Sequence, residues 1–177
     1  MCLTQATTYK LIMKCQNPRK PSHKSTLTNL NLAQETINDL EKCHPTDKCI
    51  WVALLTNRCN LSTNIRNFLW KLIHNTHKCR KYWLKMANLS KRGACTKCRT
   101  PEMMQHIVFN CKANQSTVIW NIAKKLCKMK EIIWPEGLDI TTIMALPLLK
   151  IQSENGETQH GVMHLFLIVI SECAFQI

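Results

Sequence analysis

The spacing of hydrophobic residues predicts a chain built mainly from helices. Along 27–43 an apolar residue recurs every three or four positions, which is the period of one helix face. The residues on this face are Leu30, Ala33, Ile37 and Leu40. Alternating, strand-like segments are scarce, so we expect a mainly α fold: a small helical domain with little or no β-sheet.

Capping residues and the same periodicity predict the remaining helices. Ser62 and Asp139 are suited to cap helices over 63–77 and 140–146. Further helices are expected over 50–55, 103–110 and 116–130, and an apolar one over 162–170 after a polar loop at 152–159. The last is shorter than the roughly 20 residues that span a bilayer, so we expect a buried helix and no membrane partner, with a membrane-surface helix as the alternative. The residues expected to face inward are Trp51, Leu54, Leu55, Ile65, Phe68, Leu69, Leu72, Ile73, Val118, Ile119, Ile122, Ala123 and Leu126.

The net charge of +13 is concentrated in one part of the chain. Between Asp47 and Glu102 there are 12 Lys or Arg residues and no Asp or Glu. Such a segment favours a polyanionic partner, and the aromatic rings within it are suited to stack on nucleobases. In the alternative, the basic residues form a solvated face and the rings belong to the core. The residues predicted to contact RNA or DNA are Lys71, Lys78, Arg80, Lys81, Tyr82, Trp83, Lys85, Arg92, Lys97 and Arg99.

Eleven cysteines indicate metal binding more than disulfides. Their number is odd, and the first 14 residues show no apolar run typical of a signal peptide. We therefore expect an intracellular protein, nuclear or cytoplasmic and not secreted, in which clustered Cys and His residues bind a metal.

Four of these residues have the spacing of a structural zinc site. Cys95, Cys98, His106 and Cys111 form the pattern C-x2-C-x7-H-x4-C. A tight turn can present the first pair, and the next helix can supply the other two ligands of a tetrahedron that leaves no open position. The alternative is a chance cluster in a Cys-rich chain.

A second group is a weaker metal site, because its surroundings are strongly basic. It consists of His74, His77 and Cys79, whose histidines are better suited to face solvent or phosphate. The sequence also lacks a paired nucleophile and base, a carboxylate cluster and a Gly-rich phosphate loop, so no catalytic site is predicted.

Several segments together resemble the C-terminal zinc-binding region of non-LTR retrotransposon reverse transcriptases, most closely those of fungal elements. The run 65–74, followed by Lys81-Tyr82-Trp83, is similar to the helix ahead of that module. The segments 29–40 and 50–51 are similar to the connector that follows an RNase H domain. The pattern of the module continues through Cys95, Cys98, Glu102, His106, Cys111 and Trp120.

The resemblance covers roughly residues 9–175 and implies a fragment of a transposon reading frame, truncated at both ends. It implies a Zn²⁺ cofactor, with element RNA or target DNA as partner. The polymerase and RNase H catalytic motifs are absent, so those activities do not carry over. Cys79-Arg80 replaces an apolar or small pair of the family, and a Trp before the first Cys is missing; both departures favour a decayed copy.

Four regions follow from these arguments. Residues 1–26 are expected to be a basic, Pro-containing tail from the end of a lost RNase H domain, 27–90 a basic helical connector, 91–135 the zinc-binding module, and 136–177 a truncated helical segment. The leading hypothesis is a zinc-stabilised nucleic-acid-binding module without a catalytic site. The alternatives are a structural or protein-interaction zinc module and a nonfunctional relic.

Overall fold

The computed structural model describes residues 23–55, 61–111, 116–134 and 137–149, and it is mainly helical there. Its helices are α2 (Lys24–Glu41), α3 (Asp47–Leu55), α4 (Thr63–Ile73), α5 (Arg80–Leu84), the 3-10 helix η2 (Ala87–Gly93), the π-helix η3 (His106–Asn110), α6 (Ser116–Met129) and α7 (Ile140–Ala145). Within these ranges the β pairing is one isolated bridge, between Ala94 and Pro101. The predicted fold class is therefore confirmed.

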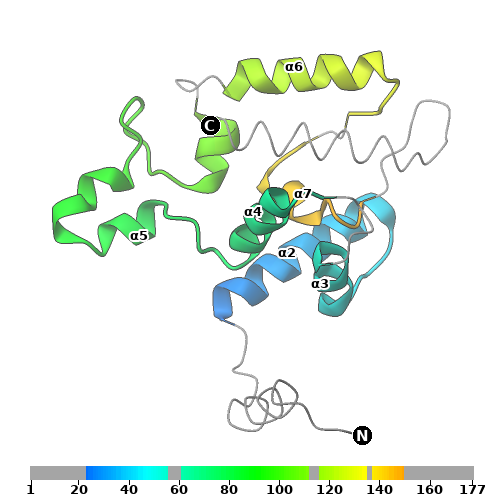
Figure 1. The fold of residues 1–177 in the computed structure, drawn as a ribbon, viewed down its shortest axis with the longest axis horizontal. Coiled ribbons are helices and arrows are strands. Elements are labelled where there is room, and N and C mark those ends of the chain that lie inside the picture. Colours follow the sequence, from blue (N-terminus) through cyan, green and yellow to red (C-terminus); the bar gives the residue numbers. More distant parts are fainter. Residues whose placement is uncertain (1–22, 56–60, 112–115, 135–136, 150–177) are drawn as a thin grey trace, which may run out of the picture.

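The helices α2, α3, α4 and α7 gather around one hydrophobic core (Figure 1). α2 presents Leu30, Ala33 and Ile37 to it, as the sequence predicted. Leu40 is an exception: it lies on the last turn of α2 and stays exposed. The buried face of α2 therefore runs from Thr26, near the start of the helix, to Ile37.

The helix expected over 63–77 is α4, which ends earlier, at Ile73, and buries the face that the sequence predicted. All five residues of the expected stripe are buried: Ile65, Phe68, Leu69, Leu72 and Ile73. Ser62 caps the helix by accepting a hydrogen bond from the Ile65 amide at 3.3 Å. The helix ends at Ile73 because Asn75 adopts a left-handed conformation with φ 52°.

α3 and α6 show where periodicity gave the wrong inward face. Leu55 is 67% exposed, because α3 buries the row Ile50, Ala53 and Leu54, and the next residue points about 100° away. On α6 the expected inward residues Val118, Ile122 and Leu126 are 57%, 53% and 41% exposed. Ala123 is buried as expected, and it is joined by Ser116 and Cys127, because the apolar arc of α6 is wide and only one edge of it meets the rest of the structure.

α7 joins the C-terminal part of the described chain to the first helix. The Thr36 hydroxyl donates a hydrogen bond to the Thr141 hydroxyl at 3.0 Å, and α7 buries Ile143, Met144 and Ala145. The segments expected at 27–90 and from 136 onwards thus share a core. α2 begins within the segment expected as a tail. The rest of that tail, the polar loop at 152–159 and the apolar helix at 162–170 lie outside the described residues.

Asp139 is the cap of α7 that the sequence predicted. Its Oδ1 accepts hydrogen bonds from the Thr142 amide at 2.8 Å and from the Thr141 and Thr142 hydroxyls at 2.7 and 2.9 Å. Burial opposes ionisation, but these hydrogen bonds prevail and lower the pKa of the carboxyl. The ionised cap therefore stabilises the fold above the ordinary pKa of an Asp, and this stabilisation is lost as the pH falls through the lowered pKa.

We expect Asp139→Ala to lower the free energy of unfolding by about 1 kcal/mol at neutral pH, since three hydrogen bonds to one helix start are removed. Urea denaturation measures this change. Asp39→Ala is the matched control, because Asp39 is exposed within α2. Equal losses in the two variants would contradict the capping role.

Candidate metal centre

A tight turn presents the C-x2-C pair. The bridge between Ala94 and Pro101 closes the base of the turn. Within it the Cys95 amide donates to the Thr100 carbonyl at 2.8 Å, and the Arg99 amide donates to the Cys95 carbonyl at 2.9 Å. Arg99 has a φ of 59°, which reverses the chain directly after the second cysteine. Both sulfurs therefore lie on one small loop.

His106 is the first residue of the π-helix η3, and Cys111 follows its last residue, at the end of the region where a short helix was expected. A wide turn joins them, because the Cys111 amide donates to the His106 carbonyl, five residues earlier, at 2.8 Å. π-turns of this kind are frequent at functional sites. Two side chains of α6 hold this π-turn. The Trp120 indole donates to the Val108 carbonyl at 2.7 Å, and the Ser116 hydroxyl donates to the Cys111 carbonyl at 3.2 Å.

The four side chains converge. One ligand atom from each of Cys95, Cys98, His106 and Cys111 lies within 4.8 Å of every other. The Sγ atoms of Cys95 and Cys111 are 3.7 Å apart, and Cys98 Sγ is 3.2 Å from His106 Nε2. With metal–sulfur bonds of about 2.3 Å, the edge of a tetrahedron is about 3.8 Å. The cluster is thus consistent with one tetrahedrally bound metal ion.

Local hydrogen bonds lower the pKa of two of the thiols, Cys95 and Cys98. The backbone amides of Cys98 and Lys97 are the main cause that lowers the pKa of the Cys95 thiol to about 7. The Thr100 hydroxyl, 2.9 Å from Cys98 Sγ, lowers the pKa of that thiol too. Because the thiolate is the form that binds metal, both effects favour coordination at neutral pH.

The second Cys and His group does not converge. Among the described residues, the four-residue cluster is the one group of three or more possible ligands that lie close enough to hold an ion. His74 Nδ1 is 3.0 Å from the hydroxyl of Thr26, whereas His77 Nε2 is 3.2 Å from the Phe68 carbonyl oxygen. The two imidazoles are therefore engaged with different parts of the fold.

The basic helix α5 is attached directly to the cysteine turn. The Arg80 amide donates to the Glu102 carbonyl at 2.9 Å, and the Glu102 amide donates to the Gly93 carbonyl at 3.1 Å. Gly93 is buried against Leu84, and a Cβ atom at this position would lie 3.2 Å from two of its side-chain atoms. A larger residue at the end of η2 would therefore require the Leu84 side chain to shift by a few tenths of an ångström.

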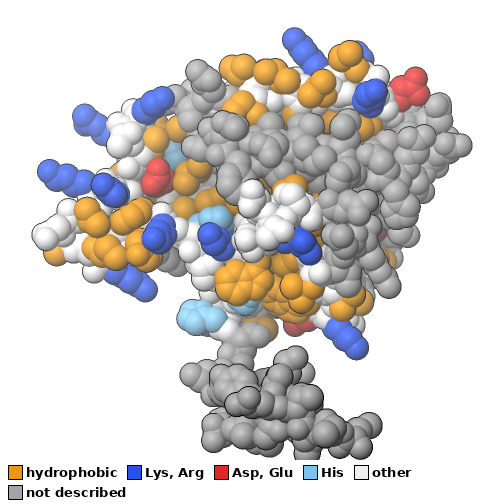
Figure 2. Space-filling view, in the orientation of Figure 1, with side chains coloured by type: hydrophobic (Ala, Val, Ile, Leu, Met, Phe, Trp, Pro, Cys, Tyr) orange, Lys and Arg blue, Asp and Glu red, His pale blue; other side chains and the backbone are white. Residues whose placement is uncertain are grey.

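Nine of the ten residues predicted to contact nucleic acid lie between residues 78 and 99, on α5, on η2 or in the cysteine turn and next to them, whereas Lys71 is on α4. Basic side chains surround the end of the molecule to which α5 belongs (Figure 2). Lys71 is on α4, Lys78 precedes α5, Arg80, Lys81, Tyr82 and Trp83 are on it, Lys85 caps it, Arg92 is on η2, and Lys97 and Arg99 are in the cysteine turn. The side chain of Lys81 lies outside what the structure describes.

The two aromatic rings of α5 differ in availability. The Arg92 guanidinium lies 5.3 Å from the centre of the Trp83 ring, and Tyr82 meets the same ring edge-on at 5.0 Å. Trp83 is thus half-buried among its neighbours. Tyr82 is more exposed, with the Lys78 ammonium 5.6 Å from its ring centre. Sequence reasoning missed Trp70, whose ring is 45% exposed at the C-terminal end of α4.

Comparisons with protein-family models, with curated proteins and with solved structures found no match. No helix among the described residues is long and apolar enough to cross a bilayer.

The lowered pKa of Cys95 gives a direct test of the turn. In metal-free protein, we expect the rate of Cys95 alkylation by iodoacetamide to rise as the pH passes through about 7, because the thiolate is the reactive form. Cys79 is the control, since burial and then the charge of Glu102 raise the pKa of its thiol. Peptide mass spectrometry distinguishes the two sites. A common pH dependence at both would contradict the described hydrogen bonding.

Proposed function

We propose that this chain is a zinc-stabilised nucleic-acid-binding module of the kind found at the C-terminal end of non-LTR retrotransposon reverse transcriptases, with no catalytic step of its own. The observation that carries the proposal is the direct attachment of a basic helix to a four-ligand cluster. In the proposal, Zn²⁺ fixes the cysteine turn, the turn fixes α5, and the basic residues then hold element RNA or target DNA near a polymerase.

The donor set favours zinc over other ions. Three sulfurs and one imidazole suit a soft or borderline metal, whereas magnesium and calcium prefer oxygen. Three thiolates, a neutral imidazole and Zn²⁺ carry a net charge of −1, which is stabilised by the basic side chains of Lys97 and Arg99 nearby in the sequence. With all four positions filled by protein, the ion has a structural role.

Charge supports a nucleic-acid partner over an uncharged one. The described acidic residue nearest in sequence to α5 is Glu102, and its backbone is occupied in holding the turn to α5. Phosphate contacts by exposed lysines and arginines release counterions, so such binding weakens steeply with salt.

A second candidate, a protein-interaction module, is favoured by one observation on α6. Val118, Ile122, Leu126 and Met129 form an exposed apolar stripe along this helix. A stripe of this kind suits a partner helix. The third hypothesis, a nonfunctional relic, predicts a chain that shows little helix by far-UV circular dichroism with or without a chelator.

Metal content per chain tests the first step. We expect purified protein to hold one zinc ion per chain, and Cys111→Ser to lose it, since a tetrahedral site tolerates the loss of a thiolate poorly. Cys127→Ser is the matched control, because Cys127 is equally buried but lies in α6 apart from the cluster. Zinc loss in both variants, or in neither, would contradict the assignment of ligands.

A salt titration tests the second step. We expect the logarithm of the association constant for RNA or DNA to fall linearly with the logarithm of salt concentration. The double substitution of Lys81 and Lys85 to Gln should make this slope shallower by about 2, roughly 1 for each phosphate that is no longer neutralised. Replacing Lys124 and Lys128 on α6 by Gln removes the same charge elsewhere and should leave the slope unchanged. Salt-independent affinity would favour the protein-interaction module.

A further inference from the structure

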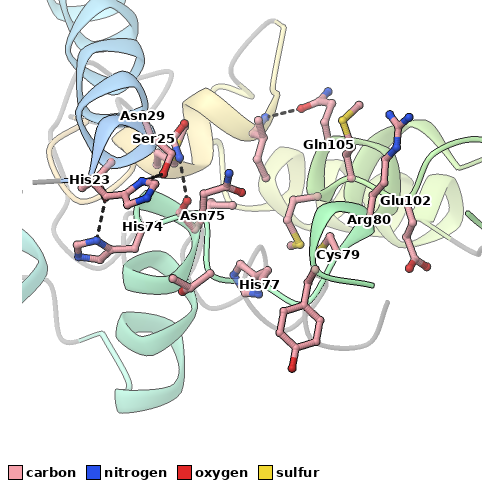
Figure 3. Close-up of a pocket in the computed structure, with 18 of the residues that line it drawn as sticks. His23, Ser25, Asn29, His74, Asn75, His77, Cys79, Arg80, Glu102 and Gln105 are labelled. Carbon is pink, nitrogen blue, oxygen red and sulfur yellow. Dashed lines mark hydrogen bonds between the residues drawn. The ribbon is translucent and has the colours of Figure 1, made fainter. Parts of the chain in front are cut away.

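A groove of about 930 Å³ lies beside the basic helix α5, within the range of roughly 300–1,000 Å³ usual for ligand pockets. It is formed where the start of α2, the end of α4, the loop after α4, α5 and residues 102–105 meet, with two side chains of α7 at its base. In Figure 3, His74 and Asn75 lie on one side and Arg80, Glu102 and Gln105 on the other, with His77 between them.

Aromatic rings provide one kind of surface in this groove. The Trp70 ring, 45% exposed, leans on His74 with ring centres 4.2 Å apart, and His74 in turn stacks on Trp51 at 5.2 Å. His74 is held by its 3.0 Å hydrogen bond with the buried Thr26. Trp70 is therefore positioned by packed neighbours, while part of its side chain remains exposed. Tyr82, 36% exposed, also lines the groove.

Polar groups inside the groove can recognise the edge of a base. Burial is the main cause that lowers the pKa of His77, so its imidazole is neutral at physiological pH. The Nε2–H group then donates to the Phe68 carbonyl at 3.2 Å, which leaves Nδ1 as an acceptor. Gln105 Oε1 accepts from the Ile140 amide at 3.0 Å, which leaves the NH₂ group of Gln105 as a donor.

Charge at the groove matches a phosphate backbone. Arg80 and Lys85 line it with exposed side chains, and Glu102 is the one carboxylate among its described lining residues. Cations beside open rings are the combination that binds single-stranded nucleic acid, in which bases are free to leave the stack. In a duplex the bases are stacked and paired, so neither ring faces nor base edges could enter the groove.

We propose that this groove holds unpaired nucleotides, so that the partner of the chain is single-stranded RNA or DNA and not duplex. One base stacks on Trp70, with its edge toward His77 and Gln105, and the flanking phosphates lie on Arg80 and Lys85. The inference rests on the proposed function and deepens it, because it specifies the class of nucleic acid and a stacking residue.

The test compares a fluorescein-labelled 12-nucleotide oligo(U) or oligo(dT) with a 12-base-pair duplex, using the full zinc-loaded chain and fluorescence anisotropy. We expect the single strand to bind more tightly. Trp70→Ala should weaken single-strand binding about tenfold and leave duplex binding within about twofold, because the substitution removes one stacking interaction. Trp70→Phe should retain most of the affinity. Leu55→Ala, an exposed apolar truncation outside the groove, is the matched control.

A crosslinking measurement keeps the test independent of folding in the variants. Photocrosslinking of a 4-thiouridine oligonucleotide to the unsubstituted chain should label the peptide that contains Trp70 or the one that contains Tyr82. Salt-sensitive binding that prefers duplex, or that ignores Trp70 and labels other peptides, would overturn the groove and leave the proposed function standing. Absence of binding to either probe would overturn both.

Discussion

The convergence of three sulfurs and one imidazole is the constraint that brings the cysteine turn, with α5 attached to it, against the π-helix η3. The two halves of the cluster are attached to different helices. The cysteine turn is hydrogen-bonded to α5 through Arg80 and Glu102, and the π-helix is hydrogen-bonded to α6 through Trp120. An ion bound by all four ligands would tie these supports together. The energy of coordination would therefore contribute directly to the stability of the fold.

The basic helix α5 needs contacts with the cysteine turn to keep its position. Clustered like charges repel one another and destabilise a compact state, and α5 is only five residues long, too short to be stable by itself. α5 keeps its place through the buried Gly93 beside Leu84 and through the amide of Arg80, both of which belong to the path that leads into the cysteine turn. A polyanion bound on this face would relieve the repulsion, so metal and nucleic acid would stabilise the same conformation.

Residue spacing and capping preferences correctly predicted features that depend on a few neighbouring residues. Spacing was sufficient to select Cys95, Cys98, His106 and Cys111, and short side chains with a hydrogen-bond acceptor were sufficient to place the caps Ser62 and Asp139. Tertiary contacts decided the rest. Which edge of the wide apolar arc of α6 is buried depends on its packing against η3, and the groove at Trp70 requires residues that lie far apart in sequence. Periodicity carries no information on either.

X-ray absorption at the zinc K-edge tests the central claim most directly, because it reports the ligands of the ion without substitution. The account predicts a first shell of three sulfur atoms at about 2.3 Å and one nitrogen at about 2.0–2.1 Å in the purified chain. A shell of oxygen and nitrogen alone, or one with a single sulfur, would show that the four side chains do not share one ion and would contradict the account.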